Sequence, residues 1–460
     1  MSSQATDPPH ASDNCVENSQ VGDGASTAVS PRMTRLRHSL LAALFLSACA
    51  NDVVDNGDVV ASYPGDNKAD EACEWQREIV DEELGRSRGE HSTLRIDRDG
   101  FAHIVYEDHP VDSRNGVQVR YATNRSGQWL TSVVSTTCRL MAGETDYQPL
   151  GTRSNSNFDL DADGHAFIVC SNADSVLLLD NARGSWRETE VRTPAQAYAE
   201  CRANEHVPDE AYSACRYYTH DFGRHVAMRL DSHGTPHIVY SAERDQQYSS
   251  HDEWLEYSTK VGTTWVHESI GGNSFYFDVA VDGRDRVHVV KQVDLGAYEG
   301  KGLGYTTNVT GAWQTTTLAS TRRGSMGLFV SAAVAKSGRL HAVHFDNTGY
   351  ADHAYTSGLT YLKKGNGPAL ATELKRANVT EALVPDIALD VDENVHIIYY
   401  DQGSLVYQLL KGDQMYPPMT VDQGGVGRHP SLALGGGTIH VTYFDIAESR
   451  LKYARWACAQ

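Results

Sequence analysis

Residues 93–134 read TLRIDRDGFAHIVYEDHPVDSRNGVQVRYATNRSGQWLTSVV, and this stretch decides the fold because the chain repeats it. It contains four short runs with the alternating apolar and β-branched pattern of strands: 93–97, 102–106, 117–122 and 129–134. Turn signals, Asp99-Gly100 and Ser126-Gly127, separate the first run from the second and the third from the fourth. The stretch therefore predicts an antiparallel meander of four strands.

The same order of runs returns along the chain, and a histidine in the second run marks each copy. The markers are His103, His237, His288, His341, His396 and His440, with Phe167 at this place in the second copy. An aspartate stands six residues upstream in five copies: Asp97, Asp161, Asp231, Asp282 and Asp390. A tryptophan opens the fourth run at Trp129, Trp186, Trp265 and Trp313. Four-stranded units repeated in this way are typical of β-propellers. The sequence thus predicts an all-β fold, a seven-bladed β-propeller of four-stranded antiparallel blades over residues 73–460.

The last copy lacks its fourth run, because the chain stops soon after Tyr453. Residues 75–81, WQREIVD, have the tryptophan-led form of the missing strand and precede the first full copy. We expect this amino-terminal strand to complete the seventh blade, which would remove two exposed sheet edges. Cys73 and Cys458 fall where the other copies have a hairpin turn, so the alignment predicts a disulfide between them.

The amino-terminal residues predict export. Residues 1–32 are polar and without periodicity, and we interpret them as a disordered or mis-assigned upstream extension ahead of a start at Met33. Residues 33–49 form a basic segment and a short apolar run ending in Leu-Ser-Ala-Cys49, the pattern of a lipoprotein signal peptide. An ordinary secretory signal is the alternative. Residues 50–72 predict a flexible tether. We expect acylation of Cys49 and a lipid anchor in the bacterial outer membrane.

Six cysteines remain once Cys15 and Cys49 are set aside, and an even number in an exported protein suggests disulfides. Besides the predicted Cys73–Cys458 bond, Cys201 and Cys215 bracket an insertion at residues 193–223 and are expected to pair. Cys138 and Cys170 are then left for each other. The spacings do not include Cys-x-x-Cys, so a zinc site is not expected.

The charge balance bears on partners. Sixty Asp and Glu against 40 Lys and Arg give a formal net charge of −20, which argues against nucleic acid as a partner. The run from Asp159 to Gly164 looks like the start of a calcium loop, but Phe167 and Cys170 occupy the positions where further acids are needed. Turn chemistry is the favoured interpretation. We expect no cofactor, with calcium as the alternative.

The first run of each copy supplies candidate site residues. Alternation should turn every second side chain toward the central channel of a propeller. The residues so placed include Arg95, Asp159, Arg229, Asp278 and Asp386. They form either a self-satisfied ionic cluster or a polar ligand site at the channel mouth. His220, in the long insertion, is a further candidate. At the starts of the loops between second and third runs, Asp108, Asp346, Asp401 and Asp445 predict an acidic arc.

The repeat Asp-x-Asp-Gly-x-x-His-Ile-x-Tyr, followed by Tyr-Ala and Gly-x-Trp, resembles the sialidase-like (BNR-type) propellers of bacterial exported lipoproteins. The resemblance covers residues 73–460 and implies the fold rather than an activity. Two function classes remain: a non-catalytic propeller that binds a glycan or protein, and a carbohydrate-active enzyme, either a polysaccharide lyase or a sialidase-like glycosidase. The sequence carries no nucleophile elbow, phosphate loop or zinc helix, which favours binding.

Overall fold

The computed structural model describes residues 73–81, 86–110, 116–140, 156–172, 175–204, 222–245, 251–272, 274, 276–296, 300–320, 325–347, 357–377 and 384–458. The predicted extension, signal peptide and tether, with Cys49, lie outside this part of the chain, as do His220 and Cys215. In the described part no helix is both long and apolar enough to span a bilayer.

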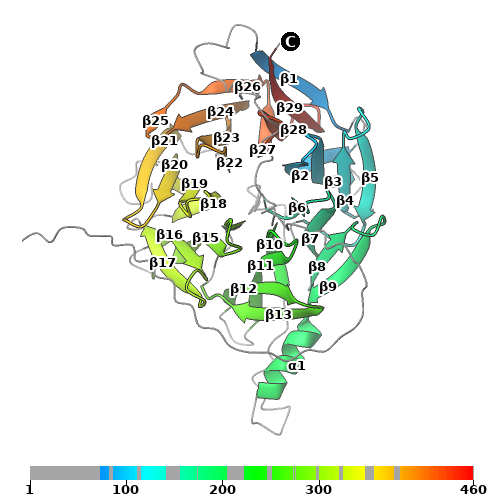
Figure 1. The fold of residues 1–460 in the computed structure, drawn as a ribbon, viewed down its shortest axis with the longest axis vertical. Coiled ribbons are helices and arrows are strands. Elements are labelled where there is room, and N and C mark those ends of the chain that lie inside the picture. Colours follow the sequence, from blue (N-terminus) through cyan, green and yellow to red (C-terminus); the bar gives the residue numbers. More distant parts are fainter. Residues whose placement is uncertain are drawn as a thin grey trace, which may run out of the picture. The chain divides into compact units, whose positions relative to one another are not determined.

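The described chain is built almost entirely from strands that pair in antiparallel units (Figure 1). One unit contains β2 (Arg86–Ile96), β3 (Ala102–Pro110), β4 (Gln118–Thr123) and β5 (Leu130–Ser135). The next contains β6 (Phe158–Leu160), β7 (Ala166–Asn172), β8 (Ser175–Asp180) and β9 (Arg187–Arg192). It is followed by β10 (Phe222–Leu230), β11 (Pro236–Asp245), β12 (His251–Val261) and β13 (Thr264–Ser269).

The second half of the chain continues this arrangement. Strands β14 (Phe277–Val281), β15 (Val287–Asp294), β16 (Lys301–Thr307) and β17 (Gln314–Ala319) form one unit. Strands β18 (Ser325–Val334), β19 (Leu340–Asn347), β20 (Ser357–Lys364) and β21 (Leu370–Ala377) form another, joined to the previous unit by the single parallel pair Lys301 and Ser325. Then come β22 (Pro385–Leu389), β23 (Val395–Asp401) and β24 (Ser404–Lys411), with a fourth strand split into β25 (Gln414–Met415) and β26 (Met419–Gln423).

The last unit draws on both ends of the described chain. Strands β27 (Val426–Gly435), β28 (Thr438–Asp445) and β29 (Arg450–Cys458) are completed by β1 (Cys73–Ile79), which pairs antiparallel with β29. Cys73 lies opposite Cys458 in this register, and the two are joined by a disulfide. The all-β fold of four-stranded antiparallel sheets is confirmed.

The first strands of the units contact one another in chain order, from β2 through β6, β10, β14, β18 and β22 to β27. Strand β27 in turn contacts β2, so these contacts form a closed ring around a common axis (Figure 1). A residue on a first strand can therefore meet residues of units that are far away in the sequence.

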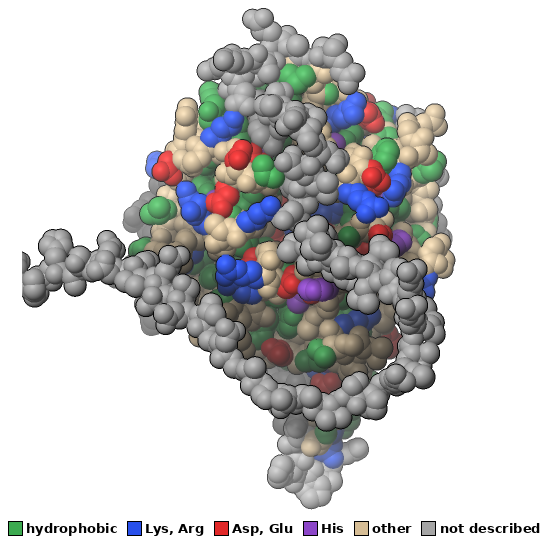
Figure 2. Space-filling model, in the orientation of Figure 1, with side chains coloured by type: hydrophobic (Ala, Val, Ile, Leu, Met, Phe, Trp, Pro, Cys, Tyr) green, Lys and Arg blue, Asp and Glu red, His purple; other side chains and the backbone are tan. Residues whose placement is uncertain are grey.

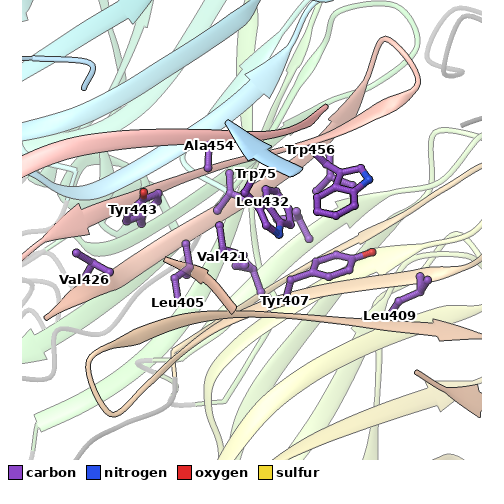
Figure 3. Close-up of a cluster of buried hydrophobic side chains, with 13 residues drawn as sticks. Trp75, Leu405, Tyr407, Leu409, Val421, Val426, Leu432, Tyr443, Ala454 and Trp456 are labelled. Atoms are coloured by element: carbon purple, nitrogen blue, oxygen red, sulfur yellow. The ribbon is translucent and has the colours of Figure 1, made fainter. Parts of the chain in front are cut away.

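The hydrophobic core lies between neighbouring units, because each sheet covers the face of the next. Figure 3 shows one such layer, in which Trp75 of β1 lies near Tyr407 and Leu405 of β24. The Trp75 ring stands edge-on to Tyr407 and to Trp456, with centroids 5.8 and 5.3 Å apart. The amino-terminal strand is thus packed into the core on one face and paired along its edge.

Two further cysteine pairs were predicted. Cys138 and Cys170 form a disulfide, which ties the segment after β5 to β7 of the following unit. Cys201 lies on α1 (Pro194–Asn204) and is disulfide-bonded, whereas Cys215 lies outside the described residues, so this pairing stays a prediction. The helix begins with a capping box, in which Thr193 and Gln196 each accept the other's backbone N–H.

Gly435 stands at or near the place of the recurring aspartate in the last copy of the repeat. A Cβ atom at Gly435 would lie 2.3 Å from Ile96 Cγ2 on the neighbouring unit, so no side chain has room there. We expect Gly435→Ala to destabilise the protein by roughly 1–3 kcal/mol through overpacking. Gly365→Ala is the matched control, because a Cβ there meets nothing within 4 Å. Chemical unfolding of both variants measures the effect, and equal stabilities would contradict it.

Candidate functional site

The recurring histidines are part of the packing inside each unit. In six units the histidine Nδ1 lies 2.5–2.8 Å from the hydroxyl of a third-strand tyrosine: Tyr121, Tyr257, Tyr305, Tyr361, Tyr407 and Tyr453. In His103 the other ring nitrogen, Nε2, lies 3.0 Å from Asp97 Oδ2. A carboxylate only accepts, so Nε2 carries the proton and Nδ1 accepts the tyrosine O–H. Burial lowers the pKa of all six histidines, which favours this neutral form.

The same network continues into the next unit through the tryptophans. The indole of Trp129 stands edge-on to Tyr453, and that of Trp186 to Tyr121, with ring centroids 5.1 and 5.4 Å apart. The indole N–H of Trp129 also donates to Glu78 at 2.8 Å. The residues that recur most regularly in the sequence therefore connect strands and units, and they leave no histidine of this set exposed for catalysis among the described units.

Around the axis, one layer of first-strand side chains forms a hydrogen-bonded belt. We define this inner belt as Thr93, Asn157, Asp278, Ser331, Asp386 and Ser431, all of which are buried. Asp386 accepts hydrogen bonds from the hydroxyls of Ser331 and Ser431 at 2.7 and 3.2 Å and from the Leu432 N–H at 2.7 Å. Its carboxylate therefore links β22 to the first strands on both sides.

Asp278 has the same role two units away. Its Oδ2 accepts the backbone N–H of Ala332 at 2.8 Å, and its Oδ1 accepts the Val279 N–H and the Ser156 hydroxyl. The side chain is fully buried, and burial raises the pKa of Asp278. Both belt aspartates were candidates for ligand binding, but their oxygens are used to join neighbouring units.

A second layer, two residues further along each first strand, carries charge. Arg95, Asp159 and Arg229, here called the axial group, lie opposite His103, Phe167 and His237 in the strand register. Arg95 Nε donates to Asp159 Oδ1 at 3.3 Å, and each of the two side chains is 17% exposed. Asp159 Oδ2 accepts the Leu230 N–H at 2.9 Å, which places this carboxylate between the two arginines.

The arginines of the axial group keep unused hydrogen-bonding capacity. Arg95 Nη1 donates to its own strand at Leu94 O, while Nη2 is buried and has no partner among the described residues. Arg229 Nη1 donates to Met228 O at 3.2 Å, and no described carboxylate lies within ion-pair distance of its guanidinium. Burial, reinforced by the positive charge of Arg229, lowers the pKa of Arg95 to about 10.

Arg229 and the start of β10, to which the long insertion is connected, lie at opposite ends of that strand. Arg229 is next to the last residue of β10, close to the turn at Asp231, whereas the 193–223 insertion joins the start of the same strand at Phe222. Seven residues of strand separate the two, or roughly 23 Å. Most of the insertion, with His220, lies outside the described residues, so its place in a site with the axial group stays a prediction. The axial group belongs to the end of the ring that carries the first-to-second-strand turns.

The calcium-like run is occupied by protein donors. Asp161 Oδ1 accepts the backbone N–H groups of Asp163 and His165 at 2.9 and 2.8 Å, which is ordinary turn chemistry. Asp159, the first residue of the run, binds Arg95 and Leu230 instead. Asp159 and Asp161 therefore accept hydrogen bonds from different groups and do not form one set of metal ligands.

One group of potential metal ligands was missed by sequence reasoning. Asp231, His233 and Asp285, from the turns of neighbouring units, have ligand atoms within 4.8 Å of one another. Protein donors already occupy this group, since Asp231 accepts the N–H groups of His233 and Thr235, and Asp285 accepts the N–H and hydroxyl of Ser232. No sequence signal could have found it, because the two turns are brought together only by the ring.

The predicted acidic arc is largely neutralised. Asp401 binds Lys375, Asp445 binds Lys452 at 2.6 Å, and Arg120 Nη1 lies 3.5 Å from Asp108. Asp346 accepts the Thr360 hydroxyl and lies against His344. Acidic and basic side chains are also interspersed over the described part of the face shown in Figure 2. These loop-start aspartates fix strand ends and do not present an unbalanced charge.

No known protein family and no curated protein matches the sequence. Solved structures do match the fold. An ulvan lyase bound to -[GlcA(1-4)Rha3S]- is 11% identical, with a TM-score of 0.51 over 82% of this chain and 95% of that one. An α-L-arabinanase from Penicillium chrysogenum, 10% identical, has a TM-score of 0.43 over 84% and 98%. The NanB sialidase from Streptococcus pneumoniae, 12% identical, has a TM-score of 0.40 over 82% and 70%. At this level of identity, the likeness to the ulvan lyase is one of fold alone.

Proposed function

We propose that this chain is an exported, membrane-anchored protein whose seven-bladed β-propeller, closed by β1, binds a glycan and does not cleave it. The antiparallel units, the ring of first-strand contacts and the pairing of β1 with β29 support the blade count and the closure. The ulvan lyase, whose structure is similar at the level of the fold, was solved with a glycan fragment bound, which supports the choice of ligand class.

One observation carries the preference for binding over catalysis. The groups that could act as acids or bases along the ring axis are buried and engaged: the histidines with tyrosines, and Asp278 and Asp386 with neighbouring strands. The polar groups that remain partly exposed there are the guanidinium groups, which do not exchange protons near neutral pH, and the Asp159 carboxylate, whose oxygens accept Arg95 Nε and the Leu230 N–H. Among the described residues, this site can hold a ligand, and its one partly exposed carboxylate is already engaged by hydrogen-bond donors, which favours binding over general-base catalysis.

A panel of neutral and acidic polysaccharides, incubated with the purified protein, tests this function. Binding is followed by retention of the polysaccharide, and cleavage by the appearance of shorter chains. We expect retention of at least one polysaccharide without a change in its length. Shortening of any member of the panel would favour the second candidate, a polysaccharide lyase or glycosidase, and the absence of both retention and shortening would contradict both.

The anchoring part of the proposal concerns residues outside the described chain. We expect translation from Met33, cleavage before Cys49 and acylation of that cysteine, because the basic, apolar and Leu-Ser-Ala-Cys segments follow one another in the required order. Intact-mass measurement of protein extracted from membranes should show a lipid-sized increment on a chain that begins at Cys49. A soluble mature protein with an unmodified amino terminus would contradict the anchor.

A further inference from the structure

The turn between β18 and β19, in the fifth unit of the chain (β18 to β21), differs from the turns at the same place in most other units. In five units an aspartate begins this turn, and its Oδ1 accepts the backbone N–H groups two and four residues further on, at 2.7–3.0 Å. The aspartates are Asp97, Asp161, Asp231, Asp282 and Asp390. The fifth unit has Ala335 at this place, and a methyl group cannot accept a hydrogen bond.

The backbone of this turn nevertheless keeps the shape of the others. Ala335 N donates to Arg339 O at 2.9 Å, and Gly338 N donates to Ala335 O at 2.8 Å. In the fourth unit (β14 to β17) the corresponding bonds, which involve Asp282, are 3.0 and 2.9 Å long. The N–H groups of Ser337 and Arg339 are therefore directed to the place that a carboxylate takes in the other units. Arg339 N donates instead to the Ser337 hydroxyl, at the longer distance of 3.3 Å.

His341 adds a buried donor at the same place. In the other five units with a recurring histidine, its Nε2 lies 3.0–3.5 Å from an acceptor, which is the aspartate in four units and Gly435 O in the last. His341 Nδ1 lies 2.7 Å from the Tyr361 hydroxyl, as in those units, and accepting this O–H leaves the proton on Nε2. His341 is 2% exposed, and its Nε2 has no hydrogen-bond partner among the described residues. A buried donor without an acceptor is costly unless something else binds it.

The charged groups around His341 favour an anion there. Besides burial, which is the main cause of the lowered pKa of His341, the charges of Glu393, Lys363 and Arg339 act on its ring. Glu393 is already paired, because Arg339 Nη1 donates to its Oε2 at 2.5 Å. Lys363 Nζ lies 3.5 Å from Asp413, but this carboxylate is 98% exposed, so solvent weakens the pair. The surroundings of the ring therefore carry more effective positive than negative charge.

The kind of donors distinguishes an anion from a water molecule. A buried water molecule accepts hydrogen bonds, but it also has two hydrogens of its own to place. The groups directed to this place all donate: Ser337 N–H, Arg339 N–H and His341 Nε2–H. An anion only accepts, as the Asp282 carboxylate does in the fourth unit, where it takes two backbone N–H groups, an arginine and a histidine. An anion therefore fits the donors of the fifth unit better than water does.

We infer that the turn from Ala335 to Arg339 binds one small monovalent anion, of the size of chloride or formate, which accepts the Ser337 and Arg339 N–H groups and His341 Nε2–H. Ala335 and His341 are 4% and 2% exposed, which restricts the anion to the size of the carboxyl group that alanine lacks. Ser337 is exposed, so solvent reaches the turn. The anion stabilises the fifth unit as an aspartate stabilises the others. This inference goes beyond the proposed function and does not depend on it.

Thermal unfolding in a buffer whose only anion is gluconate, which is too large for this place, measures the effect. Sodium chloride or sodium formate then replaces sodium gluconate at constant ionic strength. We expect each to raise the melting temperature by about 2–4 °C and to saturate, because a ligand that binds only the folded protein stabilises it. Ala335→Asp supplies the carboxylate covalently, so it should melt above the unaltered protein in gluconate and should not respond to either anion. Val391→Asp, which adds the same charge to an exposed side chain in the neighbouring unit, is the matched control and should respond as the unaltered protein does.

A gain of response provides a second test. Asp282→Ala gives the fourth unit the same alanine, arginine and histidine at the places where the fifth unit has them. This variant should melt at a lower temperature in gluconate and regain part of the loss when formate is added. A folded Asp282→Ala protein without such a regain would overturn the inference. So would an Ala335→Asp protein that responds to the anions as the control does, or an unaltered protein that responds to neither anion.

Discussion

A protein that begins at residue 82 is expected to aggregate instead of folding. It lacks β1, which pairs with β29 along seven residues, and it exposes the edge of β29. It also loses the core contacts of Trp75, a side chain with 7% of its surface exposed, and removal of such a buried aromatic costs about 3–5 kcal/mol. The hydrogen bond from the Tyr106 hydroxyl to Asp81, at 2.6 Å, disappears with the strand. Size-exclusion chromatography of the refolded protein measures the outcome.

The matched control begins at residue 73 and retains the strand. It should elute as a monomer and unfold at the temperature of the chain that begins at residue 50. Replacement of Cys73 and Cys458 by serine in this control should leave a folded protein with lower stability. The chain-entropy model gives a disulfide across 385 residues on the order of 5 kcal/mol, an upper figure because the paired strands already restrain the ends. A soluble, monomeric protein beginning at residue 82 would contradict the role of β1.

Acid should destabilise this protein well above the pH at which carboxylates titrate. Burial lowers the pKa of His341 and of His440 to about 4, and it lowers the pKa of the other recurring histidines as well. An unfolded histidine titrates near 6.5, so the unfolded chain binds more protons below that pH. The stability that these neutral histidines contribute is therefore fully present above about pH 6.5, and it is lost as the pH decreases toward 4. At pH 4.5 we expect a loss of about 2–3 kcal/mol for each of these two residues.

His341 offers the cleanest variant, because Ala335 replaces the aspartate in its copy of the repeat. His341→Gln keeps an acceptor for the Tyr361 hydroxyl, 2.7 Å away in the folded protein, but it does not titrate. Urea unfolding at pH 7.5 and 4.5 should show a smaller difference between the two pH values than in the unaltered protein. Asp282 does not affect the comparison between pH 7.5 and pH 4.5. Its pKa is lowered to about 2, so the stability that its carboxylate contributes is lost only as the pH falls from about 4 toward 2. An unchanged difference would show that burial of neutral histidine is not the cause.

Regular repeats made most of the fold predictable. The pairing of His103 with Tyr121 recurs in five more units, at separations of 11 to 20 residues, and it joins strands of one unit, so local pattern and tertiary structure agree. The position of Cys73 opposite Cys458 could also be predicted from the sequence, because the incomplete last copy left one position for the amino-terminal strand. Where a residue serves the repeat, its position in one copy predicts its position in the others.

Departures from the repeat were not predictable in this way. The alternating pattern predicted a first strand from residue 93, but β2 begins at Arg86 and passes through register shifts between Arg88 and Thr93. His91 adopts a left-handed φ of 58° there, and this interrupts the alternation on which the prediction depended. His429 does the same in β27, with a φ of 51°. Bulges are set by contacts between units, which a single run of sequence does not contain.

The candidate site was half predictable for the same reason. Alternation placed Arg95, Asp159 and Arg229 toward the axis, and the structure brings Arg95 against Asp159. The alternation could not show that Asp278 and Asp386 join neighbouring first strands, since their donors, such as Ala332 and Leu432, are about 50 residues away in sequence. Nor could it show at which end of the ring the arginines lie.

The proposed function requires the ring axis to bind a glycan without cleaving it. The most direct measurement incubates the protein with an oligosaccharide that it retains, and follows bound fraction and chain length in the same sample. We expect saturable binding, loss of that binding in the Arg95→Gln, Arg229→Gln double variant, and an oligosaccharide of unchanged length. Shortened products with the unaltered protein, or equal binding by the folded double variant, would contradict it.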